Sequence, residues 1–452
     1  MKVIHVPFCF YPNAIGGTEV YVEALSRHLQ QQGLQILIAA PGNVNESYSH
    51  NRLSVYRFAV SNQVTRLQEV YGEGDRQSAN EFGKILDEEQ PDLVHLHAFT
   101  RGVSLRLVRV AKQRKIPVIF TYHTPTVSCQ RGTLMRWGTQ VCDGKVNLRT
   151  CSQCTLQGLG LNWISASAIG NIPPMVGRCL GGLHLHGGVW TAIRMTELAS
   201  YRYSALQNLL SEVDHIVAVC DWVKDLLIRN HVSHEKITVS RQGLCQEIQS
   251  AKISQLGKNY TGNSSILKIA FLGRLEPIKG IDILLKAFQR TPQLAATLDI
   301  FGISQNSASD AYQTQLLNLV KHDTRISFKS PVSAKQIVNL LTDYDLLAVP
   351  SQWLETGPLV VLEAFAAGIP VIGSNLGGIA ELVQHEINGL LVEAASVEAW
   401  SRSLQRLNQE RDLLIRLRHG VRPPRHMETV AKEMLSLYHS ILQKSDKALY
   451  RK

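Results

Sequence analysis

The sequence predicts an α/β protein made of two doubly wound, Rossmann-like domains. Three observations support this prediction. The chain has 452 residues, more than a single domain usually contains. Short, nearly continuous apolar runs, such as residues 3–8 and 34–40, alternate with amphipathic stretches such as residues 18–33, which is typical of a parallel sheet with helices on both faces. The same alternation starts again near residue 266.

The first domain is expected to comprise residues 1–245. Strand and helix periods continue through residues 91–124 and return in residues 213–244. Between about residues 125 and 200, cysteines, glycines and isolated apolar residues replace these periods, so we expect an insertion there. The polar stretch 246–265 is predicted to be a linker.

The second domain is expected to comprise residues 266–422, with apolar strands at 266–275 and 345–351 and a helix at 280–290. Two such sheets in tandem would face each other across a cleft, and ligands of such sheets bind outside the carboxyl ends of the strands. Residues 423–452 are expected to form a helix that packs back on the first domain. Its apolar face comprises Val430, Met434, Leu437, Tyr438, Ile441 and Leu442.

The charge balance favours anionic partners, because the net charge is +10. Lys and Arg are scattered rather than gathered into basic runs, and no nucleic-acid-binding signature occurs, so we expect no nucleic-acid partner. The first residues are apolar over too short a stretch for a signal peptide, and no apolar run is long enough to span a membrane. The expected location is the cytoplasm, with peripheral association at the membrane face left open.

Two glutamates in the apolar run 350–374 are the first candidate site residues. Gly357 and Pro358 precede a predicted helix from about 358 to 367, whose first turn presents unpaired N–H groups to phosphate or sugar oxygens. Glu355 would lie in the loop before this helix and Glu363 within it. For an isolated pair, it is an equally good interpretation that Glu355 is an ordinary loop charge and Glu363 is solvated on an exposed helix face. Because Pro358 lacks an N–H, the expected amide donors are Leu359 and Val360.

Two cations elsewhere in the second domain favour a ligand site over ordinary surface charges. Arg274 ends a predicted strand and Lys279 follows five residues later, just before a helix, as a turn that directs two cations at a phosphate would place them.

With these residues, nearly the whole chain resembles the large retaining glycosyltransferase family of GT-B fold (glycosyltransferase family 4-like, glycosyl transferases group 1). The family's paired glutamates match Glu355 and Glu363, and its phosphate-binding Arg and Lys match Arg274 and Lys279. The resemblance implies that Glu363 holds the nucleotide ribose, Glu355 the donor sugar hydroxyls, and the two cations the diphosphate.

The resemblance extends to the first domain. Gly16 and Gly17 match the family's glycine-rich loop, where the backbone would approach donor phosphate or acceptor, although a turn that merely needs glycine is the plain alternative. His123 matches a family histidine near the reacting sugar. His97 is a weaker candidate, and His95 is expected to face the other way.

The resemblance implies transfer of a hexosyl group from a nucleotide diphosphate sugar to the hydroxyl of a saccharide or lipid-linked acceptor, with retention of configuration and no catalytic metal. The residues implied for catalysis are Arg274, Lys279, Glu355 and His123. Two alternatives stay open: a nucleotide-sugar epimerase, and a scaffold that binds sugar nucleotides without catalysis.

The insertion carries a separate signal. Four cysteines, Cys129, Cys142, Cys151 and Cys154, fall close together and include one CxxC pair, which favours a structural zinc site. An iron–sulfur cluster and unligated or redox thiols are the alternatives. The glycine-rich residues 159–190 suit neither a long helix nor a membrane span; a lipid-facing surface and an ordinary buried loop are equally open.

Overall fold

The computed structural model describes residues 1–13, 16–64, 66–183, 187–246, 266–304 and 307–449. The chain forms two compact units, which are described separately: unit 1 holds Met1–Arg241 with Met427–Lys452, and unit 2 holds Gln242–His426. Most of the predicted linker, residues 247–265, lies outside the described residues. No helix in the described ranges is long and apolar enough to cross a membrane.

Unit 1 is built on an eight-stranded sheet in the order β10-β9-β6-β5-β1-β2-β4-β3. All neighbours are parallel except β3 and β4, which are antiparallel. The strand order reverses between β1 and β5, where His5 is in register with His95. The strands are β1 (Lys2–Val6), β2 (Gln35–Gly42), β3 (Glu46–His50), β4 (Leu53–Ala59), β5 (Leu93–Leu96), β6 (Val118–Tyr122), β9 (His215–Ala218) and β10 (Ile237–Val239).

Helices pack through their apolar faces on this sheet or on one another. They are α1 (Gly17–Gln31), α2 (Arg76–Glu89), α3 (Leu105–Gln113), α8 (Met195–Glu212), α9 (Asp221–Arg229) and α18 (Met427–Leu449). The last helix belongs to unit 1 and packs against α1. Val430, Met434 and Tyr438 are fully buried on it, whereas Leu437 and Leu442 are half-buried. Helix α8 was not predicted.

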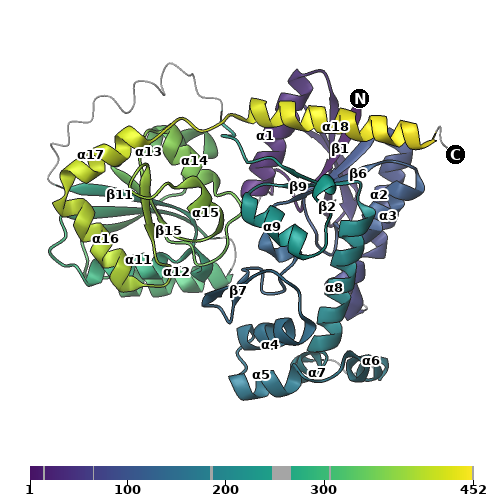
Figure 1. The fold of residues 1–452 in the computed structure, drawn as a ribbon, viewed down its shortest axis with the longest axis horizontal. Helices are drawn as coiled ribbons and strands as arrows, with labels where there is room; N and C mark the ends of the chain where they lie inside the picture. The colour runs from purple at the N-terminus through teal and green to yellow at the C-terminus, as the bar shows by residue number, and fades with distance from the viewer. Residues whose placement is uncertain (14–15, 65, 184–186, 247–265, 305–306, 450–452) are drawn as a thin grey trace. The chain divides into compact units, whose positions relative to one another are not determined.

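The insertion is helical rather than irregular. It contains a short hairpin of β7 (Met135–Arg136) and β8 (Gln140–Val141), followed by α4 (Leu148–Gly158), α5 (Trp163–Ile169), α6 (Pro174–Gly182) and α7 (Gly188–Ile193). The four helices group at one end of α8 (Figure 1). Glycine and proline keep them short, which is why no helical period was visible in the sequence.

Unit 2 has a six-stranded parallel sheet in the order β13-β12-β11-β14-β15-β16, which is the doubly wound order of a Rossmann fold. The order reverses between β11 and β14, so a ligand site is expected beyond the ends of these two strands. The strands are β11 (Leu267–Arg274), β12 (Ala296–Ile303), β13 (Ile326–Lys329), β14 (Leu346–Val349), β15 (Val371–Ser374) and β16 (Gly389–Val392).

Two apolar clusters cover the faces of this sheet. One includes Leu284 and Phe288 of α11 with Trp400 of α16, and the other includes Val361 and Phe365 of α14. The helices are α11 (Ile281–Gln289), α12 (Ser307–Leu319), α13 (Ile337–Leu341), α14 (Leu359–Ala366), α15 (Gly377–Leu382), α16 (Val397–Gln409) and α17 (Arg411–Gly420). The prediction of two Rossmann-like α/β domains is confirmed.

Candidate functional site

The loops after β11 and β14 meet at the point where the strand order of unit 2 reverses. The Lys279 ammonium lies 2.6 Å from Oε1 of Glu355, so this ion pair joins the two loops. A backbone hydrogen bond from the Gln352 N–H to the Ile278 carbonyl, 2.7 Å long, fixes the same loops to each other. The predicted cation and the predicted carboxylate therefore belong to one site.

The carboxyl of Glu355 is buried and held ionised. Burial alone would raise its pKa, but the charge and hydrogen bond of Lys279, with hydrogen bonds from Trp353 and Ser351, bring that pKa below its ordinary value. Trp353 Nε1 donates to Oε1 at 2.8 Å and Ser351 Oγ at 2.9 Å. Lys279 also lies 5.2 Å from the centre of the Trp353 ring.

Gly280 makes the approach of these loops feasible. Its φ is +68°, which is costly for other residues, and a Cβ there would lie 1.9 Å from the Pro350 carbonyl oxygen. A glycine pair supports the loop from the other side, because the Gly378 N–H donates to the Glu355 carbonyl at 2.6 Å and Gly377 has a φ of +48°. Gly280, Gly377 and Gly378 were not predicted as site residues, although each flanks a predicted element.

Glu363 lies within α14 and is also buried, so its interpretation as a solvated surface charge is wrong. Burial raises its pKa to about 7, against a hydrogen bond from Gln246 that lowers it. Gln246 Nε2 donates to Oε1 of Glu363 at 3.2 Å. A buried carboxyl that titrates near neutral pH is common at ligand sites.

The helix that carries Glu363 starts one residue later than predicted. Pro358 is its N-cap, with an extended ψ of 108°, and Leu359 is the first helical residue. The N–H groups of Leu359 and Val360 fall in the first turn, which has no intrahelical acceptors. Gly357, just before, places the backbone against Gln242, whose Oε1 would lie 2.6 Å from a Cβ at this glycine.

Arg274 occupies the end of β11, as predicted. Its guanidinium is partly exposed and pairs with Glu276 at 3.0 Å rather than with Glu355. The two cations of this loop are thus held by different carboxylates, and each keeps donors for a further anion.

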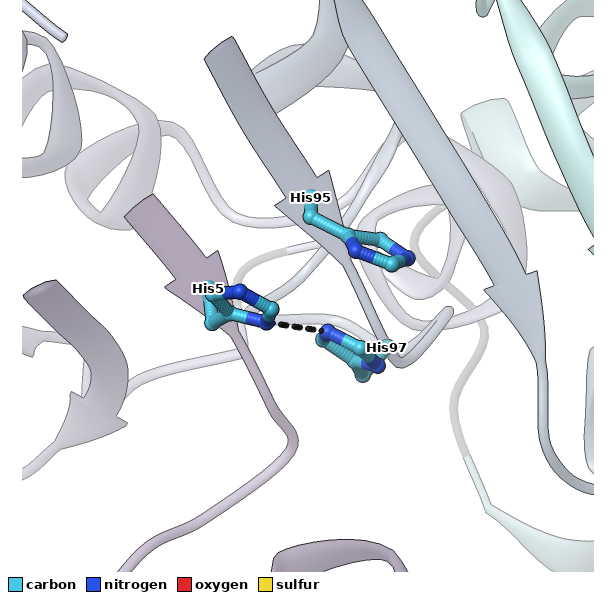
Figure 2. A group of neighbouring side chains, drawn as sticks. All are labelled: His5, His95 and His97. Carbon is cyan, nitrogen blue, oxygen red and sulfur yellow. Dashed lines mark hydrogen bonds between the residues drawn. The ribbon is translucent and has the colours of Figure 1, made fainter. Parts of the chain in front are cut away.

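In unit 1, two predicted histidines form a buried hydrogen-bonded chain with one that was not predicted. His5 Nδ1 lies 2.8 Å from His97 Nε2, and His97 Nδ1 lies 3.0 Å from His123 Nε2. Figure 2 shows His5 on its strand facing His97, with His95 beside them. These hydrogen-bonded histidines lie at the ends of β1, β5 and β6, where the strand order of this sheet reverses.

The expectation that His95 faces away from His97 is wrong. Residues two apart on a strand share a face, and the two ring centroids lie 4.1 Å apart. His95 differs in its partners: Nδ1 lies 2.7 Å from the Tyr438 hydroxyl and Nε2 lies 2.6 Å from Thr121 Oγ1. It therefore anchors α18 and stands outside the chain that reaches His123.

Burial keeps these imidazoles neutral. It lowers the pKa of His5 and of His123 to about 3, and it holds those of His95 and His97 well below the ordinary value. A neutral imidazole has one N–H, so His97 donates to one neighbour and accepts from the other. The tautomer of His123 is thereby coupled to that of His5.

Gly16 and Gly17 begin α1. Gly16 is the N-cap, and its N–H donates to Oε2 of Glu19 at 2.8 Å. Its φ of −156° is open to any residue, and a Cβ there would come no closer than 3.7 Å to a neighbour, so the structure shows no steric need for this glycine. The two residues before it lie outside the described ranges.

The four cysteines of the insertion line one cavity of about 350 Å³. Burial raises the pKa of Cys151 to about 11, and the other three thiols act in the same direction. The backbone N–H of Trp137 donates to Cys154 Sγ at 3.3 Å.

The histidines of unit 1 have ligand atoms close enough together to share one metal ion. Among the described residues, the one group of three whose ligand atoms lie within 4.8 Å of one another is His5, His95 and His97; the cysteines do not form such a group. Both nitrogens of His95 and of His97 already have hydrogen-bond partners, so a metal there would have to displace them.

Two family comparisons agree with this architecture. Residues 15–143 match the family described as Glycosyltransferase Family 4, and residues 260–422 match Glycosyl transferases group 1. A Bacillus subtilis protein named as a glycosyltransferase, YtcC, is 28% identical over 59% of this chain and 68% of its own. D-inositol 3-phosphate glycosyltransferase from Rhodococcus jostii is 34% identical over 36% of this chain and 37% of its own.

Solved structures share the fold over the whole chain. Sucrose-phosphate synthase from Thermosynechococcus elongatus has a TM-score of 0.66 at 18% identity, covering 98% of this chain and all of that one. HepE from Anabaena, solved with UDP and glucose, has a TM-score of 0.58 at 16% identity, covering 100% and 99%. At these identities the likeness establishes the fold alone.

Proposed function

Since the chain is a glycosyltransferase of GT-B type, with a family 4 domain and a group 1 domain in tandem, we propose that it transfers a hexosyl group from a nucleotide diphosphate sugar to an acceptor hydroxyl, with retention of configuration. The observation that carries the proposal is the Lys279–Glu355 pair at the strand-order reversal of unit 2. This is where a doubly wound sheet binds its ligand.

In this proposal the donor diphosphate lies over the loop after β11. Lys279 and Arg274 supply positive charge, and the first-turn N–H groups of α14 add donors, so charge that develops on the leaving diphosphate is stabilised without a metal. Glu355 would bind sugar hydroxyls, and the buried Glu363 would accept hydrogen bonds from the ribose. HepE, solved with UDP-glucose, supports a donor of this class.

In unit 1, we assign His123 to the reacting sugar and Gly16 and Gly17 to the approach of donor phosphate or acceptor. The acceptor would be a saccharide or lipid-linked sugar. We propose a cytoplasmic location, as expected from the sequence.

The test is release of free nucleoside diphosphate from a panel of nucleotide sugars, with and without a membrane extract or soluble saccharides as acceptors. A transferase releases it only when acceptor is present. Conversion of the donor without acceptor would indicate an epimerase instead, and binding without turnover would indicate a scaffold.

We also propose that the four insertion cysteines bind one structural zinc ion. Support comes from the four thiols lining a single cavity and from the N–H donor on Cys154, a contact that stabilises thiolate ligands. Their sulfurs must draw closer to surround one ion.

A further inference from the structure

The helical insertion of unit 1 leaves large apolar side chains in contact with solvent. Eight of the seventeen exposed large apolar residues found in the described chain fall between residues 159 and 190. We call these eight the apolar face: Leu159, Trp163, Ile164, Met175, Val176, Leu183, Val189 and Trp190. Ile164 is 78% exposed and Met175 is 71% exposed.

The insertion has only a small apolar core beneath these side chains. The buried cluster of the insertion contains only Leu156, Ala166 and Met195, with a few partly buried neighbours. The three short helices α5, α6 and α7 each place a pair of adjacent large apolar residues on the surface near the start of the helix. A monomeric protein rarely exposes so much apolar surface without a partner.

The helices that carry the apolar face lie together. Helices α6 and α7 pack on α8, and α5 packs on α4, which itself packs on α8. Within unit 1 they form a group at one end of α8 (Figure 1). The face is therefore presented by one compact module.

The charges around this face select the partner. The chain has 37 Asp and Glu residues, yet none occurs between residues 144 and 196. The same stretch holds Lys145, Arg149 and Arg178, all exposed, and Arg194, which is buried against Glu197 at 2.8 Å. Exposed tryptophan, aliphatic side chains and cations without carboxylates suit a lipid surface that carries negative charge.

We propose that the apolar face docks the protein on an anionic bilayer surface. Trp163, Ile164, Met175 and Val189 would enter the boundary between headgroups and acyl chains, while Arg178 and Arg149 contact the lipid phosphates. Each basic residue near such a surface adds electrostatic attraction, so binding should weaken as the salt concentration rises. The proposal is independent of which sugar the protein transfers.

Co-sedimentation of the full chain with lipid vesicles tests it. The vesicles would be phosphatidylcholine alone or phosphatidylcholine with about one third phosphatidylglycerol. We expect binding to the anionic vesicles, weaker binding to the neutral ones, and at least a tenfold loss in a Trp163→Ser, Ile164→Ser double variant. A matched control, Leu317→Ser with Ile387→Ser, removes two exposed apolar residues from unit 2 and should bind like the original protein.

Circular dichroism and thermal unfolding would show whether each variant is folded, and Met175→Ser with Val189→Ser gives a second variant on other helices. The proposal would be overturned if the protein sedimented with neither vesicle. It would also be overturned if both apolar-face variants bound the anionic vesicles as well as the original protein does. It would also be overturned if light scattering found a dimer that the same variants dissociate without any vesicle binding, because the face would then belong to a second copy of the chain.

Discussion

The ammonium of Lys279 lies 2.6 Å from Oε1 of Glu355, which is 76 residues further along the chain in the loop after the neighbouring strand. The pair holds a buried carboxylate ionised and keeps a cation at the reversal of the strand order. Since an ammonium has three donors, Lys279 can keep Glu355 and still bind a phosphate oxygen.

Gly280→Ala should disrupt the donor loop. The new Cβ would meet the Pro350 carbonyl oxygen in a backbone conformation that already disfavours alanine, so we expect a loss of about 3 kcal/mol in unfolding free energy and weaker donor binding. Gly33→Ala is the control, because Gly33 also has positive φ but has no atom within 4 Å of the added Cβ. It should cost about 1 kcal/mol and leave donor binding unchanged. Equal effects of the two variants on denaturant unfolding would argue against a close approach at Gly280.

Donor affinity should depend on pH through Glu363. Its pKa in the folded protein is raised to about 7, so the carboxyl is protonated below that pH and ionised above it. The ionised form accepts ribose hydroxyls better, and we therefore expect the donor KM to rise as pH falls from 8 to 6. Because the folded state binds this proton more tightly than the unfolded state, the unfolding free energy should fall as pH rises from about 4.5 to 7.

Glu363→Gln removes the titrating group while keeping its shape. The donor KM of this variant should be higher at pH 8 and nearly flat with pH. A KM profile identical to that of the original protein would exclude Glu363 as the origin of the pH dependence.

His97→Phe should lower kcat by about tenfold, because it breaks the two hydrogen bonds through which His97 joins His5 to His123. The donor KM should change little, since Lys279 and Arg274, the proposed diphosphate ligands, belong to unit 2. His95→Phe is the matched control: it removes a buried histidine with two hydrogen bonds from the same strand region without touching that link. Both variants should lose similar thermal stability, and equal losses of kcat would contradict a positioning role for His97.

Purified protein should contain about one zinc per chain if the insertion cysteines bind it. Elemental analysis of a Cys151→Ser, Cys154→Ser variant should show that the metal is lost, together with a lower melting temperature. Cys179→Ser changes an exposed cysteine of the same module that does not line the cavity and should keep its metal. Absence of zinc from the original protein, or iron in its place, would reject the assignment.

The alternation of apolar runs and helical periods was sufficient to predict both Rossmann-like sheets. The places of Arg274, Lys279, Glu355 and Glu363 in the fold were predictable because each lies in, or shortly after, a strand or helix with a clear sequence period, while their binding roles stay predictions. The residues that hold Glu355 in place were not predictable. Trp353, Ser351 and Gly378 act through contacts between loops, which no local sequence pattern encodes. His5 lies inside a strand, and its role depends on β1 and β5 being neighbours, which the order of elements along the chain does not state.

Titration calorimetry with UDP and UDP-glucose measures whether Lys279 binds the donor diphosphate. The control is Lys286→Ala, which removes a lysine paired with Asp282 at a similar distance of 2.8 Å on an exposed helix face. We predict that Lys279→Ala weakens binding by about two orders of magnitude and lowers acceptor-dependent release of nucleoside diphosphate at least as much, with the fold intact, while Lys286→Ala changes neither. If Lys279→Ala binds and turns over the donor as well as the control does, Lys279 does not bind the donor diphosphate.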